Sequence, residues 1–362
     1  MTRKSTINLN YANTDKDRKL REFIAEYVRV VNVIIDKLWD KQVFAGSFVT
    51  REFLEVETWL SARARQCAGK QALQIVKSQR KKKSKTMPVF KGSSIELDNR
   101  FIELQKGNNS FDIWIKLSSL GKKIIIIIPS KRHYHFNKFK DWQMKKSARL
   151  RIDSKGKIYL DVFFEKTEKE KKIEGGIIGL DCGYKKLAIM SNGDTIGKEL
   201  QAKIENISRK VQKSKAFNRA LIERNEYINK ELKQLNLDTI KEIVIEDLNN
   251  VKHGTKGKIR KEFNNKLQRW VYCYFFNRLE QHCEVVGVQL HKVNPAYTSQ
   301  TCFDCGDVHR SNRNGELFKC RSCGYTVDAD YNASLNILNR FRPQVHMVPV
   351  HKNQLEKSNI FL

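Results

Sequence analysis

The sequence is short of acidic residues, of cysteines and of long hydrophobic runs, and each shortage excludes a class of protein. Its 362 residues contain 40 Asp and Glu but 69 Lys and Arg, which gives a formal net charge of +29. No apolar run approaches the roughly 18 residues that a membrane span requires, and isoleucines 124–128 make only a strand-sized run. The first residues lack the long apolar core of a secretory signal. We therefore expect neither a membrane-spanning nor a secreted protein.

The eight cysteines are few for this length, and four of them stand in two Cys-x-x-Cys pairs. This usage indicates a bound metal in a reducing compartment rather than a disulfide framework, so we expect a cytoplasmic protein. A hydrophobic share of 40% and an aromatic share of 10% are typical of a folded globular chain. The length suggests roughly two or three domains.

The excess of positive charge indicates a polyanionic partner, either nucleic acid or an anionic membrane surface. Basic runs stand near aromatic residues, a pattern typical of proteins that neutralise phosphates and stack bases. Solvated lysine-rich loops are the alternative for any single run. Taken together, the runs favour nucleic acid as the partner and no membrane. The runs are residues 77–85, 131–133, 145–146 and 252–261, and the aromatic residues are Tyr134, Phe136, Phe139 and Trp142.

The N-terminal half changes its hydrophobic period twice. A short alternating segment at 5–12 predicts a strand, and apolar residues at helical spacing predict helices over 15–43 and 51–78. From residue 94 to residue 162, short runs with period-2 alternation are separated by turn residues. The pattern predicts a small β-barrel or sheet, formed by residues 1–14 and 86–170, with a helical domain of residues 15–85 inserted after its first strand.

The C-terminal half alternates strands with helices, which is typical of an α/β domain. We expect a charged linker at 165–172, a polar helical region at 198–235 and a long helix over 263–286. The strands that we expect are 177–181, 187–190, 240–246 and 286–291, with a hairpin turn at Asn192 and Gly193.

Two cysteine knuckles carry the strongest metal-binding signal. Cys302 and Cys305 are followed, after fourteen residues, by Cys320 and Cys323, and each pair is followed by a glycine that lets the backbone turn. Four thiolates in this spacing suit a tetrahedral, structural Zn²⁺. Four unpaired buried thiols are the alternative. The remaining cysteines are interpreted as small buried hydrophobic residues, and they are Cys67, Cys182, Cys273 and Cys283.

Three acids stand at the ends of expected elements and are candidate metal ligands. Asp181 and Glu246 end apolar strands, and Asp330 stands where a helix begins. Buried carboxylates need a compensating cation, and three that converge would bind hard divalent metals. Each acid also has a simpler explanation, as a turn cap, a solvated strand end or a helix N-cap. Spacing alone does not choose between Glu246 and Asp247, or between Asp330 and Asp328.

Four segments together resemble the TnpB family, the transposon-encoded RNA-guided DNA endonucleases related to miniature type V CRISPR effectors. The resemblance is strong over about residues 175–340, and in the N-terminal half only the layout agrees. The segments are Gly-Leu-Asp-Cys-Gly at 179–183, Ile-Val-Ile-Glu-Asp-Leu at 243–248, Val-Asn-Pro-Ala-Tyr-Thr-Ser-Gln-Thr-Cys at 293–302 before the cysteine knuckles, and Asp-Ala-Asp-Tyr-Asn-Ala-Ser-Leu-Asn-Ile at 328–337.

The resemblance implies an α+β multidomain protein with a wedge-like N-terminal β-barrel, an inserted helical recognition domain, and a C-terminal RuvC-like nuclease domain of RNase H-like α/β fold. The nuclease domain would comprise residues 171–296 and 325–342, with a zinc ribbon inserted at 297–324. The tail, 343–362, matches no part of the family, and the stretch between the first two acids is short for it.

The resemblance also implies the chemistry. Asp181, Glu246 and Asp330 would be the catalytic acids and would hold two Mg²⁺ ions, in preference to Asp247 and Asp328. A guide RNA of the omega RNA kind would direct the protein to double-stranded DNA beside a short flanking motif, in a prokaryotic cytoplasm. The glycine-containing segment 249–261 would be a mobile loop that gates the site.

Three other activities compete with guided cleavage. A guided protein that binds DNA without cutting it, such as a transcriptional repressor, would not need the three acids. A transposase acting by strand transfer would use similar acids but no guide RNA. A guide-free nuclease of the junction-resolving kind would need a smaller basic half than this chain has.

Overall fold

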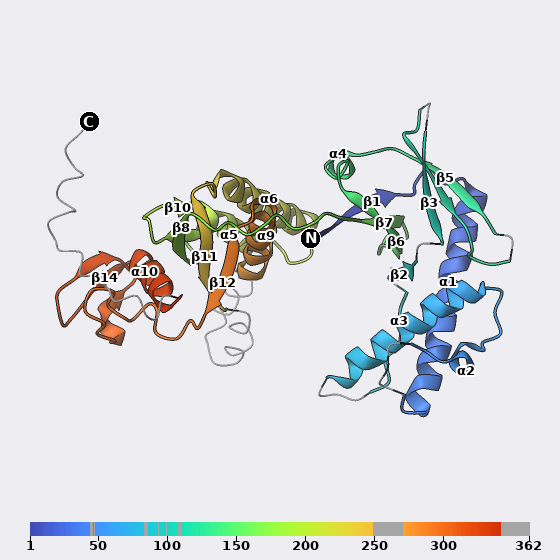
Figure 1. Ribbon diagram of the computed structural model, residues 1–362, viewed down its shortest axis with the longest axis horizontal. Helices are drawn as coiled ribbons and strands as arrows, with labels where there is room; N and C mark the ends of the chain where they lie inside the picture. The colour runs from blue at the N-terminus through green and yellow to red at the C-terminus, as the bar shows by residue number, and fades with distance from the viewer. Residues whose placement is uncertain are drawn as a thin grey trace. The chain divides into compact units, whose positions relative to one another are not determined.

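The computed structural model describes residues 1–341 except 44, 45, 47, 83–85, 93, 99, 108, 109, 123 and 249–270 (Figure 1). The chain divides into two compact units, Met1–Thr167 and Glu168–Leu362, and both combine helices with sheets, as the predicted α+β class requires. Within the described ranges, no helix has both the length and the apolar character needed to cross a membrane.

The longest helix of the first unit, α1 (Thr14–Asp40), has a capped start and one continuous apolar face. The Asn13 side chain accepts a hydrogen bond from the Lys16 backbone N–H, and two aspartates in the first turn complement the helix dipole. The buried face packs against α3 (Ala62–Arg80), as Figure 1 shows. Helix formation here follows from the apolar spacing in the sequence.

The single helix predicted over 51–78 is wrong, because the structure has two helices there, α2 (Arg51–Leu54) and α3. The segment between them is extended. Leu60 pairs with Gly121 in an isolated β-bridge, and Ser61 caps the start of α3. Apolar residues that complete a helical pattern in the sequence therefore make tertiary contacts instead.

The strands of the first unit form two antiparallel sheets rather than the closed β-barrel that the sequence predicts. The larger sheet has the order β1-β7-β6-β2 and the smaller sheet the order β3-β4-β5. Each sheet has two edge strands with a single neighbour, so no barrel closes among the described residues. The strands are β1 (Thr2–Asn8), β2 (Ser94–Leu97), β3 (Ile102–Lys106), β4 (Ile113–Leu117), β5 (Ile126–Ser130), β6 (Gln143–Ile152) and β7 (Ile158–Glu165), with the short helix α4 (Tyr134–Asn137) before β6.

The inserted helices cover the free edge of β2, which is why no further strand pairs there. Gln71 on α3 donates from Nε2 to the Ser94 carbonyl at 2.8 Å and accepts from the Glu96 N–H at 3.4 Å. Tyr27 on α1 donates its hydroxyl to the Glu96 carbonyl at 3.2 Å. Backbone groups at a buried sheet edge require partners, and two buried side chains supply them here.

The second unit is built on a five-stranded mixed sheet with the order β10-β9-β8-β11-β12. β8, β11 and β12 run parallel, whereas β9 and β10 form an antiparallel hairpin extension of β8. The strands expected from the sequence are present here with shifts of a few residues at their ends. The strands are β8 (Gly176–Asp181), β9 (Ala188–Met190), β10 (Thr195–Ile196), β11 (Ile240–Glu246) and β12 (Gln289–Val293).

The two faces of this sheet carry different helices. Alternate residues of β8 and β11, among them Ile178 and Ile243, belong to the apolar core that α5, α6 and α9 cover. Because successive side chains of a strand point to opposite faces, Gly179, Asp181 and Glu246 lie on the other face, where α10 packs. The helices are α5 (Leu200–Ser208), α6 (Lys215–Gln234), α9 (Tyr272–Val286) and α10 (Ala329–Phe341).

A small antiparallel sheet of order β13-β14-β15 precedes α10 and carries the cysteine knuckles. Its last strand ends at Asp328 and α10 begins at Ala329, so the knuckles are joined directly to the helix that bears the third acid. The elements are the 3₁₀ turn η1 (Arg310–Asn312) and the strands β13 (Arg313–Asn314), β14 (Leu317–Lys319) and β15 (Thr326–Asp328).

Candidate functional site

Two of the three acids end adjacent parallel strands. Asp181 is the last residue of β8, and Glu246 is the last residue of β11. The register pairs Leu180 with Ile245, so the acids are the next residues along neighbouring strands. Because parallel strands end at the same edge, both carboxylates lie at one edge of the sheet and on one face.

The third acid reaches this edge on α10, where Asp330 stands in the first turn. The helix packs closely on β8 because Gly179 has no side chain: a Cβ there would lie 2.1 Å from the Ser334 carbonyl oxygen. A Cβ added at Gly183 would lie 3.8 Å from Asp330 Oδ2. The Asp330 carboxylate therefore lies beside the turn that follows Asp181.

The other two carboxylates of the cluster affect the ionisation of Asp181. Burial, followed by the charges of Glu246 and Asp330, raises the pKa of Asp181 well above its ordinary value, and the Arg313 guanidinium opposes this rise. Burial also raises the pKa of Glu246 against the hydrogen bond from Thr298. Carboxylates that are costly to ionise are stabilised by a cation, and oxygen ligands suit hard divalent metals. The donor set therefore fits Mg²⁺.

The acids that compete for these roles in the sequence are placed differently. Asp247 is exposed, whereas Glu246 is only 8% exposed. Asp328 accepts backbone N–H groups at the start of α10 and pairs with Lys186 Nζ at 3.2 Å. Asp328 is thus occupied as a helix cap. The geometry favours Glu246 and Asp330 as members of the acidic cluster.

Two side chains that contact the acids were not identified from the sequence. Arg313 on β13 donates from Nη2 to Asp330 Oδ1 at 2.6 Å. Thr298 donates its hydroxyl to Glu246 Oε1. Both come from the segment around the cysteine knuckles, far from the acids in sequence, so no local spacing reveals the contacts. For Thr298, its place in the segment 293–302 is the one available signal.

The four predicted zinc ligands come together. Among the described residues, they form the one group of three or more His, Cys, Asp or Glu side chains whose ligand atoms all lie within 4.8 Å of one another. The Sγ atoms of Cys302 and Cys323 are 3.7 Å apart, and those of Cys305 and Cys320 are 3.6 Å apart. A tetrahedral site with Zn–S bonds of about 2.3 Å places its sulfurs about 3.8 Å apart. The cluster therefore fits Zn²⁺.

Two asparagines of α10 attach the first knuckle to the helix. Asn332 accepts the Phe303 N–H at 3.1 Å and donates to the Thr301 carbonyl at 2.8 Å. One turn later, Asn336 donates to the carbonyls of Thr301 and Thr298, at 2.7 and 3.0 Å. Both asparagines are buried, so these bonds fix the knuckle relative to α10 and hence to Asp330.

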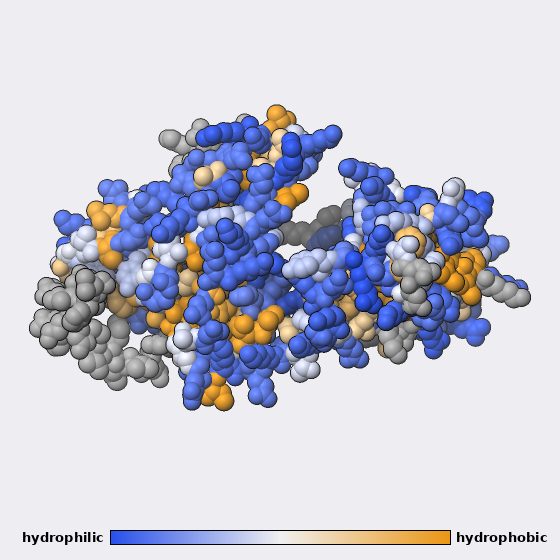
Figure 2. Space-filling model, turned by 90° about the horizontal axis from the view of Figure 1, so that it is seen from above, coloured by the Kyte–Doolittle hydropathy of each residue, from blue (hydrophilic) through white to orange (hydrophobic). Residues whose placement is uncertain are grey.

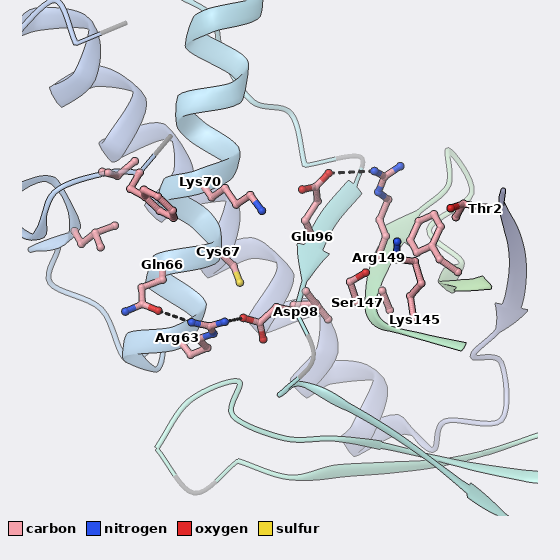
Figure 3. Close-up of a pocket in the computed structure, with 16 residues that line it drawn as sticks. Thr2, Arg63, Gln66, Cys67, Lys70, Glu96, Asp98, Lys145, Ser147 and Arg149 are labelled. Carbon is pink, nitrogen blue, oxygen red and sulfur yellow. Dashed lines mark hydrogen bonds and ion pairs between the residues drawn. The ribbon is translucent and has the colours of Figure 1, made fainter. Parts of the chain in front are cut away.

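A groove in the first unit is lined by cations. It has a volume of about 740 Å³ and lies between α3 and the β2-β6-β7 part of the larger sheet (Figure 3). Arg63 and Arg149 are each paired with a carboxylate there, and the Arg149 guanidinium lies 5.7 Å from the Phe163 ring centroid. Lys70 from α3 and Lys145 from β6 lie on opposite sides, and Lys145 Nζ pairs with the Glu165 carboxylate at 2.7 Å.

The aromatic residues that the sequence assigned to a nucleic-acid surface are placed differently from one another. Hydrophilic residues cover most of the face seen in Figure 2. Tyr134 is 79% exposed with Lys138 Nζ 4.8 Å from its ring centroid, whereas Phe139 is buried against Phe164 and is a core residue. The basic run 252–261, the gating loop at 249–261 and the tail at 343–362 lie outside the described residues.

Comparison with known proteins matches the C-terminal region to a family model described as the Cas12f1-like TNB domain, over residues 272–337. A CRISPR-associated endodeoxyribonuclease Cas12f1 of Sulfoacidibacillus thermotolerans is 41% identical over 26% of this chain and 21% of its own length. A TnpB-like protein of Methanocaldococcus jannaschii is 28% identical over 43% of this chain and 58% of its own length. The chain spans about a sixth to about a half of the length of the curated relatives that it matches first.

The fold is also similar to a solved structure. The cryo-EM structure of a Cas12f1-sgRNA-target DNA complex superposes with a TM-score of 0.61, 15% sequence identity, and coverage of 90% of this chain and 83% of the Cas12f1 chain. This likeness concerns the fold alone. Together with the family domain and the TnpB-like relatives, it confirms the resemblance found in the motifs. The chain is thus similar to proteins of the TnpB family.

Proposed function

We propose that this chain is an RNA-guided DNA endonuclease whose catalytic acids are Asp181, Glu246 and Asp330. The observation that carries the proposal is the convergence of these acids at one sheet edge, where burial and then the charges of the other two raise the pKa of Asp181. Its Cas12f1 relative is named an endodeoxyribonuclease, and the Cas12f1 structure is titled as a complex with sgRNA and target DNA.

The topology of the second unit supports an RNase H-like, RuvC-type nuclease domain. Counted from β8, its strands have the order 3-2-1-4-5, with the second strand antiparallel to the first. The first and fourth strands carry the first two acids at their ends, and the last helix carries the third. We assign this domain to residues 171–296 and 325–342, with the zinc ribbon at 297–324.

The acids would hold two Mg²⁺ ions, which supply an activated water and stabilise the departing 3′ oxygen of a phosphodiester. The protein itself would hold the three acids in position before the metal ions bind. Arg313 orients Asp330, Thr298 contacts Glu246, and Gly179 lets α10 approach the sheet.

We assign guide RNA binding and recognition of the flanking DNA motif to the first unit. The groove between α3 and the sheet supports this, because it joins the helical segment 15–85 to the strands of 1–14 and 86–170. It carries Lys70, together with Lys145 and Arg149, which would exchange their carboxylate partners for phosphates. Cations of this kind neutralise phosphates, while sequence choice would be left to base pairing between guide and target.

The three competing activities are separated by simple observations. A guided repressor has no use for three acids at one sheet edge, and a transposase would require DNA ends rather than RNA. A guide-free nuclease would cut branched DNA after its RNA is removed. Sequencing the RNA that copurifies with the protein tests the guide directly, and a defined species is expected.

The decisive test is plasmid cleavage by the RNA-loaded protein with Mg²⁺. Asp181→Ala should abolish cutting, by a factor of about 10³ or more if metal chemistry carries the rate, while target binding in a gel-shift assay stays intact. Asp238→Ala, at an exposed acid of the same unit, is the matched control and should cut normally. Substantial cleavage by the Asp181 variant would refute the assignment.

A further inference from the structure

Thr298 is a buried polar residue whose hydroxyl contacts the acidic cluster. It is 2% exposed and donates to Glu246 Oε1. The same hydroxyl lies 3.0 Å from the Pro295 carbonyl oxygen, so its single proton has two acceptors. An ionised carboxylate is the stronger acceptor of the two, so the bond to Glu246 dominates once that acid is charged.

The backbone around Thr298 is held by the helix that carries Asp330. The Thr298 carbonyl accepts from Asn336 Nδ2 at 3.0 Å, and the Arg340 guanidinium donates to the carbonyls of Asn294 and Ala296. Asn336 and Arg340 both belong to α10. Thr298 therefore joins α10 to the end of β11, and its hydroxyl is not free to follow a moving carboxylate.

We propose that Thr298 is a positioning residue that fixes the Glu246 carboxylate in one orientation for the divalent metals. The inference rests on the proposed function, because it assumes that Glu246 is a metal ligand. A glutamate has three side-chain torsions, and a fixed donor on one oxygen removes much of that freedom before a metal binds. Hydrogen-bond partners of metal ligands typically change metal affinity 10–100-fold when they are removed.

The test measures Mn²⁺ binding by isothermal titration calorimetry on the full chain without added target DNA. Thr298→Val keeps the shape but loses the hydroxyl and should weaken Mn²⁺ binding about 10-fold or more. Thr298→Ser keeps the hydroxyl and should bind within about 2-fold of the parent protein. Thr301→Val is the matched control, since that hydroxyl donates to the Tyr297 carbonyl and not to an acid.

Cleavage gives a second readout. With T298V the Mg²⁺ concentration for half-maximal cutting should rise about 10-fold, and the rate at saturating Mg²⁺ should change less. In a Glu246→Gln background, T298V should have no further effect on Mn²⁺ binding, because the partner carboxylate is gone. Melting temperature and zinc content report folding, and if T298V does not fold, T298A is compared with T298S in its place.

Two results would overturn the inference: equal Mn²⁺ affinity for T298V and T301V, or an undiminished T298V effect in the Glu246→Gln background. If the proposed function is wrong, the result is a different one: the parent protein and Asp181→Ala bind Mn²⁺ equally. If Asp181→Ala loses Mn²⁺ binding while T298V binds Mn²⁺ as the parent protein does, the proposed function stands and only the role of Thr298 is refuted.

Discussion

Asp181 bears most of the electrostatic cost of the acidic cluster. Partial burial raises the pKa of its carboxyl, and the charges of Glu246 and Asp330 act in the same direction. Arg313 compensates Asp330 directly, at 2.6 Å, but reaches Asp181 only through its longer-range charge. The charge of Asp181 therefore destabilises the folded state when no metal is bound. A neutral side chain at position 181 should remove this destabilisation.

We expect Asp181→Asn to raise the melting temperature at neutral pH with no Mg²⁺ added, by about 2–4 °C for each kcal/mol released. The pKa of Asp181 is raised on folding, so its ionisation costs stability as pH rises from below its unfolded value through its folded value. The advantage of the variant should thus grow from about pH 4 upward. Differential scanning fluorimetry across this range measures it.

The exposed Asp238→Asn is the control and should change the melting temperature little at any pH. Adding Mg²⁺ should stabilise the parent protein and not Asp181→Asn, because a ligand that binds only the folded state raises its stability. A variant that melts below the parent at every pH would mean that the Asp181 charge is already compensated.

At the scale of elements, the contact between α10 and β8 sets the position of Asp330. Gly179→Ala should separate the two elements, because the new Cβ would meet the Ser334 carbonyl and other atoms of the helix backbone, which cannot turn aside. We expect a loss of about 1–3 kcal/mol or more and a large loss of cleavage with all three acids intact. Urea unfolding and plasmid cleavage measure the two effects.

Gly176→Ala is the matched control in the same strand. Its Cβ would lie 3.7 Å from the Thr239 carbonyl, an ordinary contact, and its φ lies outside the left-handed region. Both substitutions add one methyl group to β8, but only the methyl group at position 179 would be forced against the backbone of α10. Equal stability and activity for both would contradict the close packing of α10 on β8.

The cysteine knuckles should hold their metal as one unit. Cys302→Ser should reduce zinc from about one ion per chain to near zero, since a structural tetrahedral site requires all four ligands. Because Asn332 and Asn336 tie the first knuckle to α10, the loss should also lower the melting temperature. Zinc measured by mass spectrometry should be unchanged in Cys273→Ser, an exposed cysteine remote in sequence. Retained zinc in the Cys302 variant would contradict the assignment.

Elements and candidate ligands that depend on local pattern could be predicted from the sequence. The strand ends at Asp181 and Glu246 follow from apolar runs, and the thiol cluster follows from Cys-x-x-Cys spacing. Features that depend on partners distant in the sequence could not be predicted in this way. The barrel fails to close because Gln71 covers the edge of β2, and the contact of Arg313 with Asp330 depends on how the ribbon folds back.

At the scale of the whole molecule, charge rather than shape dominates what the protein can bind. A net charge of +29 attracts phosphates without regard to sequence. Affinity alone therefore cannot identify a nucleic-acid site on this chain. The number of phosphates that a given surface neutralises is a sharper quantity, because it sets the slope of affinity against salt concentration.

The groove of Figure 3 can be tested in this way. We expect Lys70→Ala with Lys145→Ala to reduce the slope of log K against log salt, for a short DNA duplex, by about 1.5–2 units if each lysine neutralises one phosphate. Lys16→Ala with Lys19→Ala removes the same charge from α1, outside the groove lining, and should change the slope by less than one unit. Fluorescence anisotropy over a series of potassium chloride concentrations measures both. Because the two pairs lower the net charge equally, equal slopes would mean that the groove takes no special part in binding, and the first unit would have to hold nucleic acid elsewhere.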